Sequence, residues 1–237
     1  MLTGLAAPVR AFQQDDLPKL AQQLKDRDVS VRRAAVEAIA KNGSLDAVDV
    51  LASALEDPDQ NVRSDAMLAI GQLGFVKGVP PLVKMLKSQH ARDRRSAAVA
   101  LGQIGGDRAR EALVGALKEQ SPEDRESAVA ALGNMGDARA LDDLKKMLND
   151  PHPFVRASTA VALGRLGDKR AVPALITVLN DAEAQVRTGA ALSLGDLGDR
   201  SAIEPLEKLL VGEKNENVRQ QAQQALDRLR SAPSSKP

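Results

Sequence analysis

The strongest constraint on the fold of this chain is a repeat of 31 residues that runs through nearly all of its sequence. Arginine returns at this spacing, with one extra residue before the last copy, at Arg32, Arg63, Arg94, Arg125, Arg156, Arg187 and Arg219. Glycine and leucine form two more columns with the same period: Gly43, Gly74, Gly105, Gly136, Gly167 and Gly198, and Leu20, Leu51, Leu82, Leu113, Leu144, Leu175 and Leu206. Such self-similarity is typical of repeat architectures, in which each copy is one structural unit.

Each unit predicts two amphipathic helices separated by polar turns. In the unit from Arg170 to Asp199, the first segment has apolar residues three or four positions apart, at Val172, Leu175 and Leu179. The second segment has the same spacing, at Val186, Ala190, Leu194 and Leu197, and it ends on Gly198, a residue suited to the left-handed turn after a helix. Pro18, Pro80 and Pro173 share a column near the start of the first helix, where a missing amide donor costs little.

A helix of about 12 residues cannot bury its apolar face alone, so the hairpins must stack and share one core. The sequence therefore predicts an all-α solenoid of about seven hairpins over residues 17–230. The approximate repeats are 17–43, 44–74, 75–105, 106–136, 137–167, 168–198 and 199–230. Residues 1–16 are predicted to be a leader in which Phe12 caps the first hairpin, and residues 231–237 a disordered tail.

Composition argues against several functional classes. The formal net charge is +1, without the excess of cations that binding to a phosphate backbone usually needs. Cysteine, tyrosine and tryptophan are absent and there are 3 phenylalanines, which excludes thiolate chemistry and disfavours aromatic platforms for bases or sugars. No apolar run approaches the roughly 18 to 20 residues of a membrane span, and no basic residue precedes the short apolar start, so we expect a cytoplasmic protein without membrane insertion.

The repeat resembles a known family. In Asp57 to Gly71 and Asp181 to Gly195, an acidic turn leads into Val-Arg, paired small residues and an aliphatic residue before glycine, and this pattern resembles HEAT repeats. The 31-residue period is similar to the short HEAT-like subtype also seen in phycobilisome bilin lyases. The resemblance implies a right-handed solenoid with the first helices on the convex side, the second helices on the concave side, and the repeated arginines paired with acids between repeats. Asp93 and Asp124 replace the usual valine before the arginine, which predicts a less well packed middle.

A row of apolar residues is predicted on the exposed side of the second helices. On a helical wheel of about 100° per residue, Leu68 falls opposite the core residues Val62, Ala66 and Ile70. The equivalents of Leu68 in five consecutive units form what we call the aliphatic stripe: Leu68, Val99, Ala130, Val161 and Leu192. Exposed positions further along the same side hold Gln72, Gln103, Asn134 and Arg165, and Phe154 lies at the start of a second helix as a candidate anchor.

Two interpretations of this row remain open. It is either a concave groove that receives a protein segment, with aliphatic contacts in the centre and amide groups at the edge, or a set of half-buried neighbours in a tightly curved array. His90 and His152 occupy the column of Asp28, Asp59 and Ser121, where helix capping is expected, and about 18 Å would separate them, too far to share a metal.

The sequence thus predicts a non-enzymatic scaffold or adaptor for a protein partner, with no catalytic residues, no metal and no cofactor. The alternatives are a bilin-lyase-like enzyme subunit or chaperone-like tetrapyrrole-protein binder, for which Phe154, Arg92, Arg95 and Arg165 are the available groups, and a nucleic-acid binder. The nucleic-acid alternative would use a set of cations: Arg33, Lys41, Arg92, Arg95 and Arg165. It is disfavoured because acids lie on the same face: Glu37, Asp65, Glu123, Glu126 and Asp196.

Overall fold

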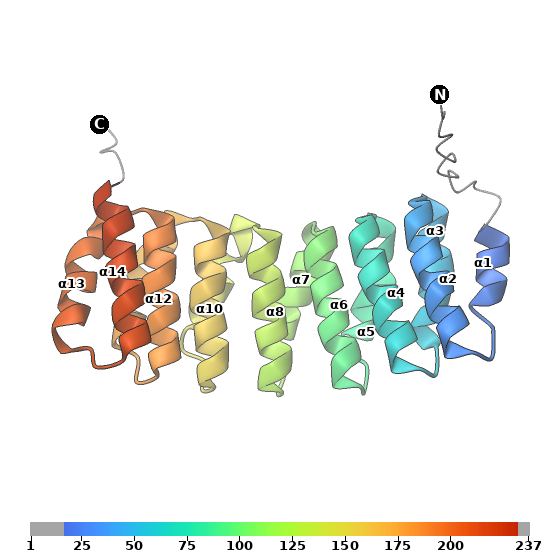
Figure 1. Cartoon of the computed structure of the whole chain (residues 1–237), viewed down its shortest axis with the longest axis horizontal. Helices are drawn as coiled ribbons and strands as arrows, with labels where there is room; N and C mark the ends of the chain where they lie inside the picture. The colour runs from blue at the N-terminus through green and yellow to red at the C-terminus, as the bar shows by residue number, and fades with distance from the viewer. Residues whose placement is uncertain (1–16, 232–237) are drawn as a thin grey trace, which may run out of the picture.

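A computed structural model describes residues 17–231, which form helices joined by short turns and contain no strand. The helices stand side by side in one elongated row, with the second helices of the hairpins in one layer and the first helices behind them (Figure 1). The second helices are α2 (Val29–Asn42), α4 (Gln60–Leu73), α6 (Ala91–Ile104), α8 (Pro122–Met135), α10 (Pro153–Leu166), α12 (Ala184–Leu197) and α14 (Glu216–Ser231). The first helices are α1 (Leu17–Gln23), α3 (Leu45–Ser53), α5 (Val79–Met85), α7 (Asp107–Ala116), α9 (Leu141–Met147), α11 (Val172–Thr177) and α13 (Ile203–Gly212). The chain is an all-α solenoid, as predicted.

The first helices are shorter than the expected 12 residues, and in α3, α5, α9, α11 and α13 this is because 3-10 turns replace part of them. These turns are η2 (Ala54–Glu56), η3 (Val76–Gly78), η4 (Ala138–Ala140), η5 (Lys169–Ala171), η6 (Val178–Asn180) and η7 (Arg200–Ala202). In α5 and α11 a proline occupies one of the first two positions, so the regular α-helix begins there and the preceding turn winds more tightly. Asp137, Asp168 and Asp199 begin three of the turns by accepting a hydrogen bond from a backbone N–H two residues later.

The second helices begin and end on local signals. Asp28, Asp59 and Ser121 accept hydrogen bonds from first-turn backbone N–H groups, which caps α2, α4 and α8. The predicted capping role of the histidines is wrong. His90 and His152 do occupy the N-cap positions of α6 and α10, but neither side chain makes a capping hydrogen bond.

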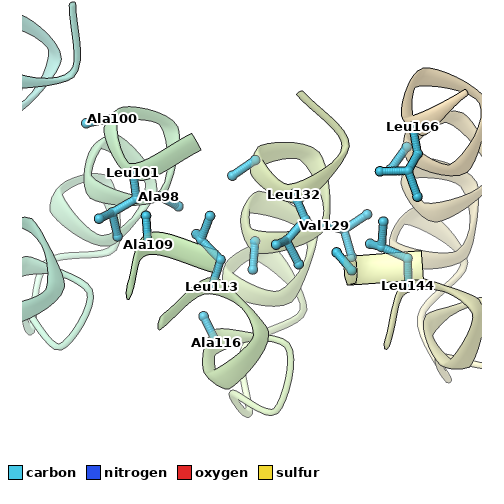
Figure 2. Packing of buried hydrophobic residues seen from close by; sticks show 14 of the residues in the cluster. Ala98, Ala100, Leu101, Ala109, Leu113, Ala116, Val129, Leu132, Leu144 and Leu166 are labelled. Atoms are coloured by element: carbon cyan, nitrogen blue, oxygen red, sulfur yellow. The ribbon is translucent and has the colours of Figure 1, made fainter. Parts of the chain in front are cut away.

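One continuous apolar core connects the layers. Leucines and alanines from α6, α7, α8, α9 and α10 pack between the two helical layers, so the buried residues of each unit are continuous with those of the next (Figure 2). Successive second helices approach very closely because small residues face each other. A Cβ atom added at Gly133 would lie 2.6 Å from the Cβ of Ala162, so only glycine fits at this spacing. Glycines take the same position at Gly71, Gly102, Gly164 and Gly195.

The repeated arginines form a ladder of ion pairs between adjacent repeats. Each of the first six arginines pairs with a carboxylate of the following unit, as Arg32–Asp57, Arg63–Asp93, Arg94–Asp124, Arg125–Asp150, Arg156–Asp181 and Arg187–Glu213. The guanidinium groups also donate to backbone carbonyls of the turn before their own helix, for example from Arg63 to Asp57 O at 2.8 Å. The ladder therefore fixes both a turn and the next repeat.

Asp93 and Asp124 belong to this ladder. The turn position that supplies the acid in Asp57, Asp150 and Asp181 is Ser88 in the third unit, which has no carboxylate. Asp93 takes its place from the first turn of α6, where it accepts from Arg63 Nε at 2.9 Å and from Ser88 Oγ at 3.0 Å. The substitution of valine by aspartate moves the acid by five residues, and it fills the position with a buried ion pair instead of leaving it loosely packed.

The predictions for the leader 1–16, including Phe12, and for residues 232–237 lie outside the described residues. Ser231, which the sequence assigned to the tail, is the last residue of α14.

Candidate protein-binding face

The exposed side of the second helices, which we call the second-helix face, is built from four positions in each helix. At about 100° per residue, the second, fifth, ninth and thirteenth residues point away from the core, while the third, seventh and eleventh point into it. In α10 the exposed positions hold Phe154, Ala157, Val161 and Arg165. The positions recur from unit to unit because the units share one packing geometry, so the face consists of four rows that cross the helices; buried Ser64, the fifth residue of α4, is an exception.

The aliphatic stripe is the row formed by the ninth positions. Leu68, Ala130, Val161 and Leu192 are half-buried, and Val99 is exposed with 39% of its surface accessible. The structure therefore places all five predicted side chains on one face, as consecutive neighbours. Because the helices approach closely, four of them are partly covered by adjacent repeats.

Amide groups border the stripe at the thirteenth positions. Gln72, Gln103, Asn134 and Arg165 are all exposed, as the wheel predicted. Arg165 Nη1 donates to Asn134 Oδ1 at 2.7 Å, so these two side chains hold each other across α8 and α10. Amides can donate to and accept from a peptide backbone, whereas the stripe offers only apolar contact.

Phe154 is the most exposed aromatic group of the described residues. Its accessible fraction is 60%, and its ring lies 5.4 Å from the ring of His152 at an angle of 35°. The prolyl residue before it begins α10 and fixes its position in the first turn. The His152 ring covers part of the phenyl ring, and the exposed remainder can pack against a partner.

At the two ends of the second-helix face, charged groups neutralise one another. Arg33 Nε lies 2.7 Å from Asp65 Oδ2, Lys41 Nζ lies 2.6 Å from Glu37 Oε1, and Arg228 pairs with Asp196. These pairs raise the pKa of Arg33 and lower the pKa of Glu37, in each case because the partner's hydrogen bond favours the charged form. The two ends of the face are therefore charged but paired.

The same face is hollowed between α2 and α4. A depression of about 560 Å³ lies there, and Leu68, Gln72 and the pair Arg33–Asp65 contribute to its wall. A second depression of about 810 Å³ lies between α11 and α13, lined by Ile176, Leu209 and other residues of the last two units. Sequence reasoning missed this second depression. The signal was the one-residue insertion between Arg187 and Arg219, which changes the spacing of the last unit.

Within residues 17–231, no three metal-ligating side chains come together. His90 and His152 begin α6 and α10, and α8 stands between these helices. In the same part of the chain, no helix combines the length and apolar character that crossing a bilayer requires.

Comparisons with known proteins agree with this architecture. The family model for HEAT repeats matches residues 17–101, 79–163 and 146–227. No curated protein is significantly similar in sequence. Among solved structures, the complex of CpcE and CpcF of phycocyanin lyase from Nostoc sp. PCC7120 is 24% identical over 96% of this chain and 100% of that chain, with a TM-score of 0.55. An engineered protein is 25% identical over 92% of this chain and 69% of its own, with a TM-score of 0.53.

A third structure, the Kap95:Nup1 complex, aligns with 92% of this chain and 36% of that chain, at 18% identity and a TM-score of 0.67. At these identities the likeness to the two natural proteins concerns the fold. The family model is more specific, because its matches together run from residue 17 to residue 227. The chain therefore belongs to the HEAT-repeat family.

Proposed function

We propose that this chain is a non-enzymatic scaffold or adaptor that binds a segment of a protein partner on its second-helix face. The observation that carries the proposal is the aliphatic stripe, which crosses five consecutive helices on the exposed side of the second helices. A solvated helix surface favours charged side chains at such positions, and contiguous apolar surface is typical of interaction sites. HEAT repeats typically bind proteins, which agrees with this assignment.

The arrangement suits a protein segment better than a small molecule. Its groups are spread along the whole row of helices, from Leu68 on α4 to Leu192 on α12, and the depression beside Leu68 is only one part of it. Phe154 and Val99 supply exposed apolar anchors, and the amides of Gln72 and Gln103 supply hydrogen bonds at the border. Central apolar contacts with polar groups at the rim are the usual anatomy of a protein interface.

The test is capture of partners from a lysate by the full chain and by the variant Val99→Asp/Phe154→Asp. These two residues are the exposed apolar members of the face, so aspartate there changes the surface without disturbing the core. Burying an aromatic anchor such as Phe154 contributes about 2 kcal/mol at an interface hot spot, and aspartate at both positions also adds charge to the apolar surface, so the double variant should lose its partner. The matched control is Leu45→Asp/Val211→Asp, which makes the same change of charge at two exposed apolar positions of first helices.

A partner that the wild type and the control retain, and that the double variant loses while remaining equally helical by circular dichroism, supports the proposal. Retention of the same partner by all three proteins would place the binding site elsewhere and refute it. A photo-crosslinker at Phe154 then shows whether the partner touches α10 directly.

A further inference from the structure

The second-helix face carries an ordered series of charges, and from it we infer the chemistry of the segment that binds there. Resting on the proposed function, we propose that the segment is extended and presents an acidic residue over α6, a basic residue over α8, and apolar residues over α10 and α12. With neighbouring helices about 8 to 10 Å apart and an extended chain rising about 3.3 Å per residue, these residues follow one another at intervals of about three.

The order of charges is the same in two separate rows. At the second positions of α6, α8 and α10, the residues are Arg92, Glu123 and Phe154. At the fifth positions of the same helices, they are Arg95, Glu126 and Ala157. Both rows therefore read basic, acidic, apolar, and both continue on α12 with an uncharged residue. The neighbouring stripe is aliphatic on all of these helices.

The two arginines are available to a partner. Arg92 and Arg95 are exposed, and neither lies within ion-pair distance of a carboxylate in the described part of the chain. By contrast, Arg33, Lys41 and Arg228 on the same face each have an acidic partner. On α6 the face thus presents two cations, Arg92 and Arg95, that an acidic residue of a bound segment can neutralise.

The two glutamates on α8 are held in place by hydroxyl groups instead of cations. Ser121 Oγ donates to Glu123 Oε2 at 2.7 Å, and Ser158 Oγ donates to Glu126 Oε1 at 3.0 Å. The hydrogen bond from Ser121 lowers the pKa of Glu123, so this carboxylate stays charged at neutral pH. Each carboxylate keeps further acceptor capacity, which a lysine or arginine of the partner can use.

The apolar part of the face follows directly. On α10, Phe154 and Val161 lie on the same side of the helix, and on α12 Leu192 continues the stripe. Gly189, also on α12, is buried against α10, where an added Cβ would lie 3.2 Å from Ala157 O and 3.4 Å from Val161 Cγ2. The two helices therefore lie close together, and the apolar surface offered to the segment continues from Val161 to Leu192.

The test uses fluorescein-labelled synthetic peptides. One has the order Glu-Ser-Gly-Lys-Ser-Gly-Leu-Ser-Gly-Leu, a second exchanges its Glu and Lys, and two more have the reversed sequences, because the rows do not fix the direction of the segment. Fluorescence anisotropy at low salt measures binding to the full chain. We expect one member of the first order or its reverse to bind about tenfold more tightly than its charge-exchanged twin, with the preference shrinking as salt is added.

The variant Arg92→Glu/Arg95→Glu/Glu123→Arg/Glu126→Arg should invert that preference without changing net charge. The variant Arg108→Glu/Glu119→Arg, which makes the same kind of exchange outside the face, should leave it unchanged. Circular dichroism checks that both variants are as helical as the wild type.

The remaining outcomes separate this inference from the proposed function. Equal affinity for both charge orders, with binding lost in Val99→Asp/Phe154→Asp, would overturn the charge order but leave the binding face intact. Equal binding to that double variant would refute the face itself. Absence of binding by all four peptides up to about 1 mM, about −4 kcal/mol, would overturn the inference, while partner capture would still decide the proposed function.

Discussion

The ion pair between Arg63 and Asp93 offers the sharpest test of how the repeats are held together. The side chains are 9% and 1% exposed, and Asp93 Oδ1 has no hydrogen-bond partner, so the carboxylate depends on Arg63 and on the hydroxyl of Ser88. Replacing Arg63 by methionine keeps the bulk of the side chain and leaves a buried, uncompensated charge. Removing one partner of a buried pair typically costs about 3 to 5 kcal/mol.

The matched control is Arg33→Met. Arg33 also pairs with an aspartate of the next unit, but those side chains are 51% and 34% exposed, so water screens the pair and its loss should cost at most about 1 kcal/mol. The double variant Arg63→Met/Asp93→Val places at position 93 the valine that other units have there. It should recover most of the free energy of unfolding that Arg63→Met loses. A deficit of about 1 to 2 kcal/mol should remain, because Asp57 O and Pro58 O lose a donor.

Urea unfolding followed by circular dichroism gives the free energies of unfolding. An unchanged slope of this free energy against urea concentration shows that the variants expose the same surface on unfolding. For a chain of this size, each kcal/mol lost from the free energy of unfolding lowers the melting temperature by about 2 to 4 °C. Calorimetry should therefore also detect the destabilisation caused by Arg63→Met. The reasoning is refuted if Arg63→Met costs no more than Arg33→Met, or if the added valine makes the single variant worse.

Three further predictions concern packing, capping and titration. Gly133→Val should lower the free energy of unfolding by about 1 to 3 kcal/mol, because it forces α8 and α10 apart. A Cβ at Gly115 meets no atom within 4 Å, so Gly115→Ala should raise the free energy of unfolding by about 0.4 to 1 kcal/mol by restricting the unfolded chain. Chemical denaturation measures both effects. His90→Asp should raise the melting temperature, since a carboxylate at this N-cap adds the missing hydrogen bond, worth about 1 kcal/mol; an unchanged melting temperature would contradict this. Hydrogen bonding from Arg139 lowers the pKa of Asp137 from 3.8 to about 2, so the unfolded chain binds the proton first and stability falls as pH drops from about 4 to about 2. Asp137→Asn should make that fall shallower in urea titrations across the window, and an identical pH profile would show that this carboxylate contributes nothing.

Much of the fold could be predicted because its determinants are local and repeated. The period of 31 residues, the apolar spacing and Gly74 at the end of α4, with φ of 70°, define each hairpin within one unit. Stacking follows, since no hairpin can bury its own apolar face. The exposed positions of the candidate site could be predicted for the same reason: Val99 and Arg165 point outward because residues two positions away, on the opposite side of the same helix, point into the core.

The contacts between units were decided by the tertiary structure. The resemblance to HEAT repeats implies that each ladder arginine pairs with an acid, yet Arg32 takes one 25 residues later and Arg63 takes one 30 residues later. Both acids occupy the equivalent position beside the arginine of the preceding unit, Asp57 from a turn and Asp93 from a helix. Only the packing of adjacent repeats makes these two positions equivalent. The degree of exposure along the stripe, such as half-buried Leu68 beside exposed Val99, likewise depends on how closely neighbouring helices approach, because burial is a property of the whole array and periodicity is a property of one helix.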